Sequence, residues 1–104
     1  MEYVLVTNHK VEDYAKWKIA FDEALDMRRA GGEKGYQIFY IRGEPNKLVA
    51  LFKWANLENA RKYFESKELE EAIKQAGVTS QIKTRFLELI EEGTVPVKDS
   101  HMWA

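Results

Sequence analysis

The chain has 104 residues, of which 45% are apolar and 32% are charged, and its formal net charge is −1. This length suits a single domain with one core, and the balanced charge gives no reason to expect nucleic acid or an anionic membrane as a partner. The sequence contains no cysteine, which excludes disulfides, thiolate metal sites and cysteine nucleophiles.

The sequence favours neither a membrane span nor a signal peptide. No apolar run approaches the roughly 20 residues that span a bilayer. No signal peptide is expected, because Glu2 stands where such a signal carries positive charge. We therefore expect a cytoplasmic protein without a membrane partner.

The first third of the chain predicts a strand followed by a helix. Residues 2–8 are rich in β-branched and aromatic side chains, which favours a strand. From Val11 onward, apolar residues recur at steps of three and four, which indicates an amphipathic helix. Asp13 is a suitable N-cap, and Gly31 and Gly32 are expected to end the helix. The stripe consists of Tyr14, Trp17, Phe21, Ala24, Leu25 and Arg28.

The middle of the chain predicts an antiparallel hairpin. Two apolar runs, 36–42 and 47–54, flank the segment 43–46, which contains glycine, proline and asparagine. These residue types favour a tight turn.

The last part predicts a second helical region and a fourth strand. Asn56 is the expected cap of a helix that breaks at Ser66 and stops at Gly77. Residues 80–91 favour a strand. We assign residues 1–92 to one domain and 93–104 to a C-terminal tail.

This order of elements predicts an α+β domain of the ferredoxin-like βαββαβ type with a four-stranded antiparallel sheet. In such a domain both helices cover one face of the sheet, yet the strands are apolar on both faces: Val49 and Leu51 alternate with Leu48, Ala50 and Phe52. The uncovered face amounts to roughly 400 Å², more than monomers usually expose. We expect a homodimer formed through this face, with the tail packing on the partner subunit through Met102 and Trp103. The alternative is a monomer whose own tail covers the face.

Two stretches, Val11 to Glu23 and Trp54 to Leu69, resemble the antibiotic biosynthesis monooxygenase-like proteins of the dimeric α+β barrel superfamily. The resemblance implies that two sheets close face to face into a barrel and that each subunit holds a pocket between sheet and helices. Some members oxidise polycyclic aromatic molecules without metal or flavin, and others degrade haem. Asn8 matches a strand asparagine of the haem-degrading members, but Tyr63 and Ile73 replace their tryptophan and iron-ligating histidine. Haem degradation is therefore not expected, and we expect no cofactor.

The candidate catalytic residues are His9 and Asn8. His9 follows the first strand and could act as a general base, because the ordinary pKa of histidine lies near neutrality. The competing interpretation is an exposed histidine without a role. Neither His9 nor His101 has an acidic residue at ligand spacing, so we expect no metal site.

A set of aromatic residues, with Asn8, could bind a flat ligand between the sheet and the helices. The competing interpretation is that the same rings form the core. Arg28 and Arg42 could bind an anion, although solvated surfaces are the simpler explanation. The candidate ligand-binding residues are Asn8, Tyr14, Trp17, Tyr40, Trp54, Tyr63 and Phe64.

Two functional hypotheses follow. The first is a cofactor-independent oxygenase that acts on a small aromatic or polyketide-like molecule. The second is a small-molecule-binding or assembly protein without catalysis, which the lack of a convincing acid–base pair favours. A cavity lined by Asn8, Tyr14 and Tyr63 would support the first hypothesis.

Overall fold

The computed structural model describes residues 1–96. Its elements follow the order strand, helix pair, strand, strand, helix pair, strand. They are β1 (Glu2–Lys10), α1 (Tyr14–Glu23), α2 (Leu25–Gly31), β2 (Glu33–Ile41), β3 (Glu44–Trp54), α3 (Leu57–Phe64), α4 (Lys67–Gln75) and β4 (Lys83–Glu88).

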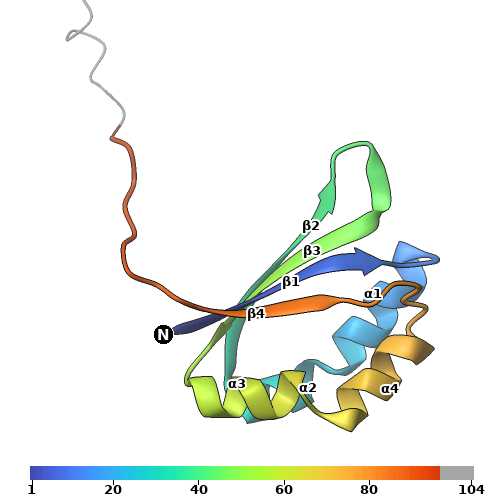
Figure 1. Cartoon of the computed structure of the whole chain (residues 1–104), viewed down its shortest axis with the longest axis horizontal. Helices are drawn as coiled ribbons and strands as arrows, with labels where there is room; N and C mark the ends of the chain where they lie inside the picture. The colour runs from blue at the N-terminus through green and yellow to red at the C-terminus, as the bar shows by residue number, and fades with distance from the viewer. Residues whose placement is uncertain (97–104) are drawn as a thin grey trace, which may run out of the picture.

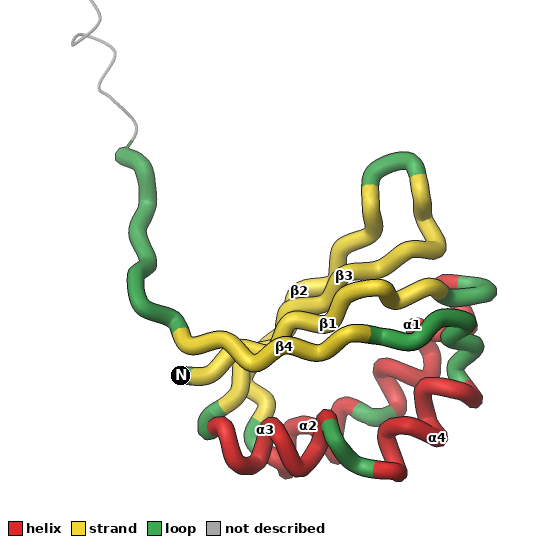
Figure 2. The backbone as a smooth tube through the Cα atoms, viewed as in Figure 1, coloured by secondary structure: helices red, strands yellow, loops and turns green. Residues whose placement is uncertain are grey.

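The four strands form one antiparallel sheet in the order β2-β3-β1-β4. All four helices lie on the same side of this sheet, and the β2–β3 hairpin extends beyond them (Figures 1 and 2). The predicted ferredoxin-like α+β fold with a four-stranded antiparallel sheet is confirmed.

The predicted helix caps are also confirmed. The Asp13 and Asn56 side chains accept hydrogen bonds from the backbone N–H of Ala15 and Asn59, at 2.9 and 2.8 Å. Ser66 separates α3 from α4, and its hydroxyl accepts from the N–H of Leu69 at 3.2 Å. Each bond satisfies an amide that the first helical turn would otherwise leave free.

Five elements differ in their bounds from the prediction. β1 continues to Lys10 and β3 begins at Glu44, within the segment expected to be the turn. The first helix is interrupted at Ala24, although backbone bonds from Ala24 to Ala20 and from Arg28 to Ala24 connect its two parts. β2 begins earlier than expected, at Glu33. β4 is shorter than 80–91, because Ser80 makes side-chain bonds in place of ladder bonds and the pairing with β1 ends at Glu88.

The main core lies between the sheet and the helices. Register pairs place Val4 opposite Phe52 and Val6 opposite Ala50 on the helix-facing side. Trp54 is completely buried there against α3. The buried members of the core are Val4, Val6, Val11, Trp17, Leu48, Ala50, Phe52, Trp54, Ala60 and Ala76.

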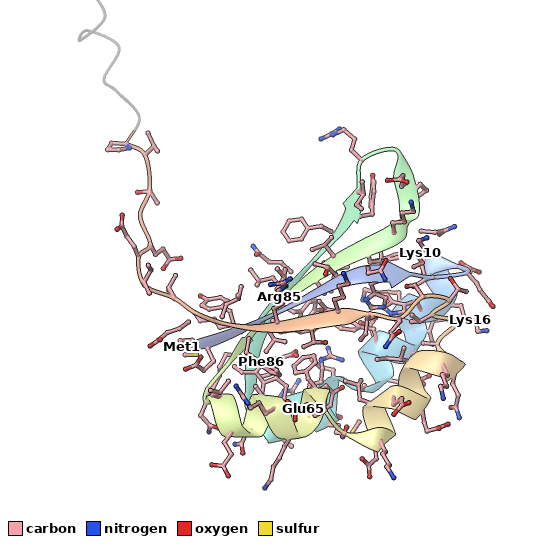
Figure 3. The ribbon with its side chains drawn as sticks, viewed as in Figure 1. Met1, Lys10, Lys16, Glu65, Arg85 and Phe86 are labelled. Atoms are coloured by element: carbon pink, nitrogen blue, oxygen red, sulfur yellow. The ribbon has the colours of Figure 1, made fainter. Side chains whose placement is uncertain are left out.

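The opposite face of the sheet is apolar along its centre, as the sequence predicts. Leu5 pairs with Leu51, and the neighbouring Phe39 is 50% exposed. Along β4, Arg85 and Phe86 point to opposite sides, with Phe86 toward the helices (Figure 3). Within the part of the chain that is described, no helix covers this open face (Figure 2).

After β4 the chain leads away from the domain (Figure 1), and Ile90 and Val95 are almost fully exposed. The expected packing of Met102 and Trp103 on a partner lies outside the described residues. Among the described helices, none is long and apolar enough to cross a membrane.

Gly32 provides a test of the turn that joins α2 to β2. Its φ of 117° is strained for any residue with a side chain, although a methyl group there would meet nothing closer than 3.7 Å. We expect Gly32→Ala to lower the free energy of unfolding by about 1–2 kcal/mol through backbone strain alone. Gly93→Ala, which meets open space, is the matched control. Equal denaturant midpoints for the two variants would contradict this interpretation.

Candidate functional site

A β-bulge in β1 determines which way the end of this strand faces. Val6 pairs with Ala50 and His9 pairs with Leu48, so Thr7 and Asn8 together lie opposite Val49. Asn8 has φ 54°, the left-handed conformation that asparagine tolerates better than most residues. The extra residue shifts the alternation of side chains by one position. His9 therefore faces the helices, on the same side as Val6.

Asn8 itself does not face the helices. It is exposed, and its Nδ2 donates to the carbonyl of Gln81 at 2.7 Å. Ser80 adds a second tie, because its hydroxyl donates to the carbonyl of Asn8 and accepts from the N–H of Lys10 at 2.9 Å. These bonds attach the bulge to the segment that precedes β4. Asn8 thus holds the conformation that turns His9 inward.

His9 is buried, with 6% of its surface exposed, which corrects the expectation of an exposed histidine. Its ring meets the Trp17 ring edge to face at a centroid distance of 5.3 Å. Neither ring nitrogen has a hydrogen-bond partner among residues 1–96. Burial lowers the pKa of His9 to about 4, so the imidazole is neutral at physiological pH.

His9 lines a cavity of about 100 Å³ between the sheet and the helices. Val6 and Phe52 of the sheet form its floor. Side chains from both helix pairs form its walls: Trp17, Ala20, Phe21, Ala24, Met27, Arg28, Tyr63, Phe64, Leu69, Ala72, Ile73 and Ala76, with Ile82. His9, Trp17, Arg28 and Tyr63 are the lining residues that carry side-chain nitrogen or oxygen atoms.

Arg28 is 2% exposed, which corrects its assignment to a solvated surface. Its Nε lies 3.0 Å from each carboxylate oxygen of Glu33, and its Nη1 donates to the carbonyl of Phe21 at 2.6 Å. Burial raises the pKa of Glu33 and the Arg28 charge opposes that rise. The ion pair joins α2 to β2 across the turn at Gly32. Nη2 of Arg28 has no hydrogen-bond partner within the described part of the chain.

Aromatic rings form one wall of the cavity between its two polar ends. Trp17 stacks on Phe21 at a centroid distance of 4.9 Å, and the Arg28 guanidinium lies 3.8 Å from the centre of the Phe21 ring. His9 stands at one end of this row and Arg28 at the other. The row gives the cavity a flat apolar wall with a titratable or charged side chain packed at each end.

The other predicted ligand-binding residues separate into two groups. Tyr63 and Phe64 line the cavity with Trp17, and burial raises the pKa of the Tyr63 hydroxyl. Trp54 packs beneath Tyr63 as core, at 5.4 Å between ring centroids. Asn8, Tyr14 and Tyr40 do not line the cavity, and the two tyrosines are 38% and 62% exposed.

The sequence analysis assigned no role to Phe21 and no buried role to Arg28. Both were in the apolar stripe of the first helix, and a charged residue in such a stripe is a signal of a buried partner. The position of Ile73, where haem-degrading proteins carry a histidine, lies within the apolar wall. Among the described residues, no group of three or more histidine, aspartate or glutamate side chains could hold a metal ion.

A scan against models of protein families gives no match, and neither does a sequence search of curated proteins. Comparison of structures does give matches. A variant of SnoaB, a cofactor-independent oxygenase from Streptomyces nogalater, aligns with a TM-score of 0.68 at 16% identity, covering 88% of this chain and 95% of the other.

Two further solved structures support the same fold. A protein described as an antibiotic biosynthesis monooxygenase aligns with a TM-score of 0.64 at 11% identity, covering 88% of this chain and 100% of the other. The monooxygenase from the gene ActVA-Orf6 of Streptomyces coelicolor, in complex with nanaomycin D, aligns with a TM-score of 0.62 at 18% identity, covering 92% of each chain. The chain therefore has the fold of antibiotic biosynthesis monooxygenases, as the resemblance implies.

The burial of His9 predicts a pH dependence of stability. Its folded pKa, about 4, lies below the ordinary value of 6.5, so the unfolded chain binds more protons between these values. The free energy of unfolding therefore falls as the pH drops from about 6.5 to 4, and the contribution of His9 is on the order of 3 kcal/mol. We expect His9→Leu to reduce this slope in urea titrations and to stabilise the protein at pH 7, because it removes an unpartnered buried polar group.

Glu33 contributes to the pH dependence of stability with the opposite sign, because its pKa is raised. This contribution is present in both the parent protein and His9→Leu, so it cancels when the two slopes are compared. An unchanged slope in His9→Leu would show that His9 is not the group that resists protonation.

Proposed function

We propose that this chain is a cofactor-independent oxygenase that binds a small hydroxylated aromatic molecule in the cavity between sheet and helices. The observation that carries the proposal is the state of His9: it is buried and neutral, and its two ring nitrogens have no partner among the described residues. The reaction class comes from the solved neighbours, of which SnoaB is a cofactor-independent oxygenase.

His9 would accept the hydrogen bond of a substrate hydroxyl once the ligand has displaced the side chains that cover its two ring nitrogens. Transfer of that proton to the imidazole leaves an electron-rich oxyanion, and the opposite charge of the ring raises the pKa of His9 while the ligand is bound. The oxyanion can then reduce dioxygen directly. One oxygen atom enters the ring and the other leaves as water, so that a hydroxyarene and O₂ give a quinone and H₂O.

The cavity supports this chemistry by its lack of polarity. Trp17, Phe21 and Phe64 present ring faces and edges to a flat ligand. Such a wall excludes water from the oxyanion and strengthens its interaction with the imidazolium.

We also propose that two copies pair through the open face of the sheet. The central residues of this face, Leu5 and Leu51, are apolar and lie opposite each other in the register. Pairing would remove from water the surface that no described helix covers.

A second candidate is a protein that binds such a molecule without oxidising it. The low pKa of His9 favours this alternative, because a histidine with a pKa of about 4 is a weak base at neutral pH. No carboxylate contacts the ring to strengthen it among the described residues.

Oxygen consumption tests the proposal against this alternative. The protein is mixed with electron-rich hydroxyaromatics of one to three rings, resorcinol among them, and O₂ uptake and quinone formation are followed. We expect catalysed uptake with at least one substrate, and a loss of about 100-fold or more in kcat/KM for His9→Leu, the usual effect of removing a general base. Tyr40→Phe, outside the cavity, is the matched control and should retain full activity.

Since His9→Leu is expected to be more stable than the parent protein, lost activity could not be attributed to unfolding. Binding without O₂ uptake across the whole panel would overturn the oxygenase proposal and favour the binding protein.

Light scattering at micromolar concentration tests the dimer. We expect a mass of about twice the 12.2 kDa of one chain, and a return to one chain for Leu51→Glu, because a charge at the centre of the apolar face opposes its burial. Gln75→Glu, at the exposed end of α4 on the other side of the sheet, adds the same charge away from this face and is the control. A single-chain mass for the parent protein would overturn the pairing.

A further inference from the structure

The open face of the sheet carries cations but no anion among its aligned side chains. Alternation along the strands assigns these side chains, and the register aligns them across the sheet. Arg85 points to this side, away from the helices (Figure 3). In rows across β2, β3, β1 and β4, the side chains are Gly35, Lys53, Tyr3 and Leu87; Gln37, Leu51, Leu5 and Arg85; and Phe39, Val49, Thr7 and Lys83. Lys53, Lys83 and Arg85 make no ion pair within residues 1–96.

These cations constrain the pairing of two copies through the open face. Contact through Leu5 and Leu51 would bring two surfaces of the same sign together and take Lys53 and Arg85 out of water. Like charges repel across an interface, and a buried cation without a counter-charge is destabilising. A stable pair therefore needs carboxylates at the interface, and the aligned rows of the face supply none.

The segment that follows β4, residues 89–96, has the complementary composition, and we call it the arm. It contains Glu91 and Glu92 and no cation. Its apolar residues Ile90 and Val95 are each 93% exposed, and the arm leads away from its own domain (Figure 1). Neither glutamate makes an ion pair in the described part of the chain. The arm thus offers apolar and acidic side chains that its own domain does not contact.

A groove of about 730 Å³ lies on the open face beside the root of the arm. Tyr3, Leu51 and Leu87 contribute apolar side chains to it, and Lys53 contributes a cation. At Gly35 the groove stays open, because even an added methyl group would meet nothing within 4 Å. The groove therefore suits an extended chain that carries both apolar and acidic side chains.

The length of the arm is sufficient to cross a second sheet. Residues 89–96 in extended form span roughly 26–29 Å. Strands lie about 4.8 Å apart, so the four strands of a sheet measure roughly 14 Å between the axes of the outer two. An arm that starts at the edge of one subunit can therefore reach across the face of the other.

We propose that each copy of the chain lays its arm across the open face of its partner, so that one dimer exchanges two arms. Glu91 and Glu92 lie beside the partner's Lys53 and the partner's Arg85, and Ile90 enters the partner's groove. Two-fold symmetry then gives both faces their counter-charges. The inference rests on the proposed pairing of two copies and does not depend on the oxygenase activity.

Charge reversal on either side of the contact tests the exchange. The arm variant carries Glu91→Lys and Glu92→Lys, and the face variant carries Lys53→Glu and Arg85→Glu. Each variant alone places like charges together at both contacts of the dimer. We therefore expect the dissociation constant of the dimer, measured by sedimentation velocity, to rise about 100-fold or more in each.

Two further proteins control for the change of net charge and for folding. Glu65→Lys with Glu71→Lys makes the same change as the arm variant at exposed positions on the helix side of the sheet, and it should leave the dissociation constant unchanged. A chain with all four changes of the arm and face variants again has arm and face of opposite charge. It should dimerise like the parent protein.

Mixing the arm variant with the face variant distinguishes exchange from an arm that folds back on its own face. In a mixed dimer each arm meets a face of opposite charge. We expect an equimolar mixture to form mixed dimers with nearly the affinity of the parent protein, identified by their mass in native mass spectrometry. An arm that covers its own face would gain nothing from mixing, because each chain would keep its like charges together.

The outcomes separate this inference from the proposed pairing. A dimeric parent protein whose dissociation constant does not respond to either charge reversal would overturn the exchange and leave the pairing through Leu51 intact. Recovery in the chain with four changes but not in the mixture would also overturn it, in favour of an arm on its own face. A single-chain mass for the parent protein would overturn the pairing and the exchange together.

Discussion

Thr7 and Asn8 occupy in β1 the length that one residue occupies in β3, and this mismatch turns His9 toward the helices. The consequence is large because side chains in a strand alternate strictly between the two faces. Without the bulge, His9 would point to the open face with Leu5. With it, the only buried imidazole of the described chain stands at the wall of an apolar cavity. The hydrogen bond from Asn8 to Gln81 then fixes this local distortion to the segment before β4.

Buried polar groups in so small a domain are costly, which makes their arrangement informative. The Arg28–Glu33 pair loses most of its hydration, and such pairs seldom stabilise a fold more than apolar side chains of equal size would. His9 has no partner at all for its nitrogens among the described residues. His9 and Arg28 both line the same cavity, and each has side-chain nitrogen atoms without a hydrogen-bond partner among the described residues.

The sequence predicted the fold well because its signals there are local. Capping residues such as Asp13, Asn56 and Ser66 act within one helical turn, and the alternation of β3 specifies both faces of the sheet. The site was harder to predict from the sequence, because it depends on the register of β1 against β3. A regular alternation continued along β1 would put His9 on the open face, and nothing in the residue pattern except the tolerance of Asn8 for a left-handed conformation indicates the bulge.

Arg28 illustrates a second limit of prediction from the sequence. Its position in the apolar stripe was visible in the sequence, but the partner that makes its burial tolerable, Glu33, follows a glycine turn and begins the next strand. Pairing across a turn cannot be derived from helical periodicity. The same applies to Asn8, which the resemblance suggested as a ligand-binding residue and which the structure places outside the cavity as the support of the bulge.

The central claim is that His9 lies in the apolar layer rather than in water, and a proton titration followed by NMR tests it most directly. The chain has two histidines, so His101→Ala assigns their signals. The account predicts that the His9 ring stays neutral down to about pH 5 and shows close proton contacts to the Trp17 ring. A His9 signal that titrates near 6.5, the ordinary value for a solvated histidine, would contradict the account.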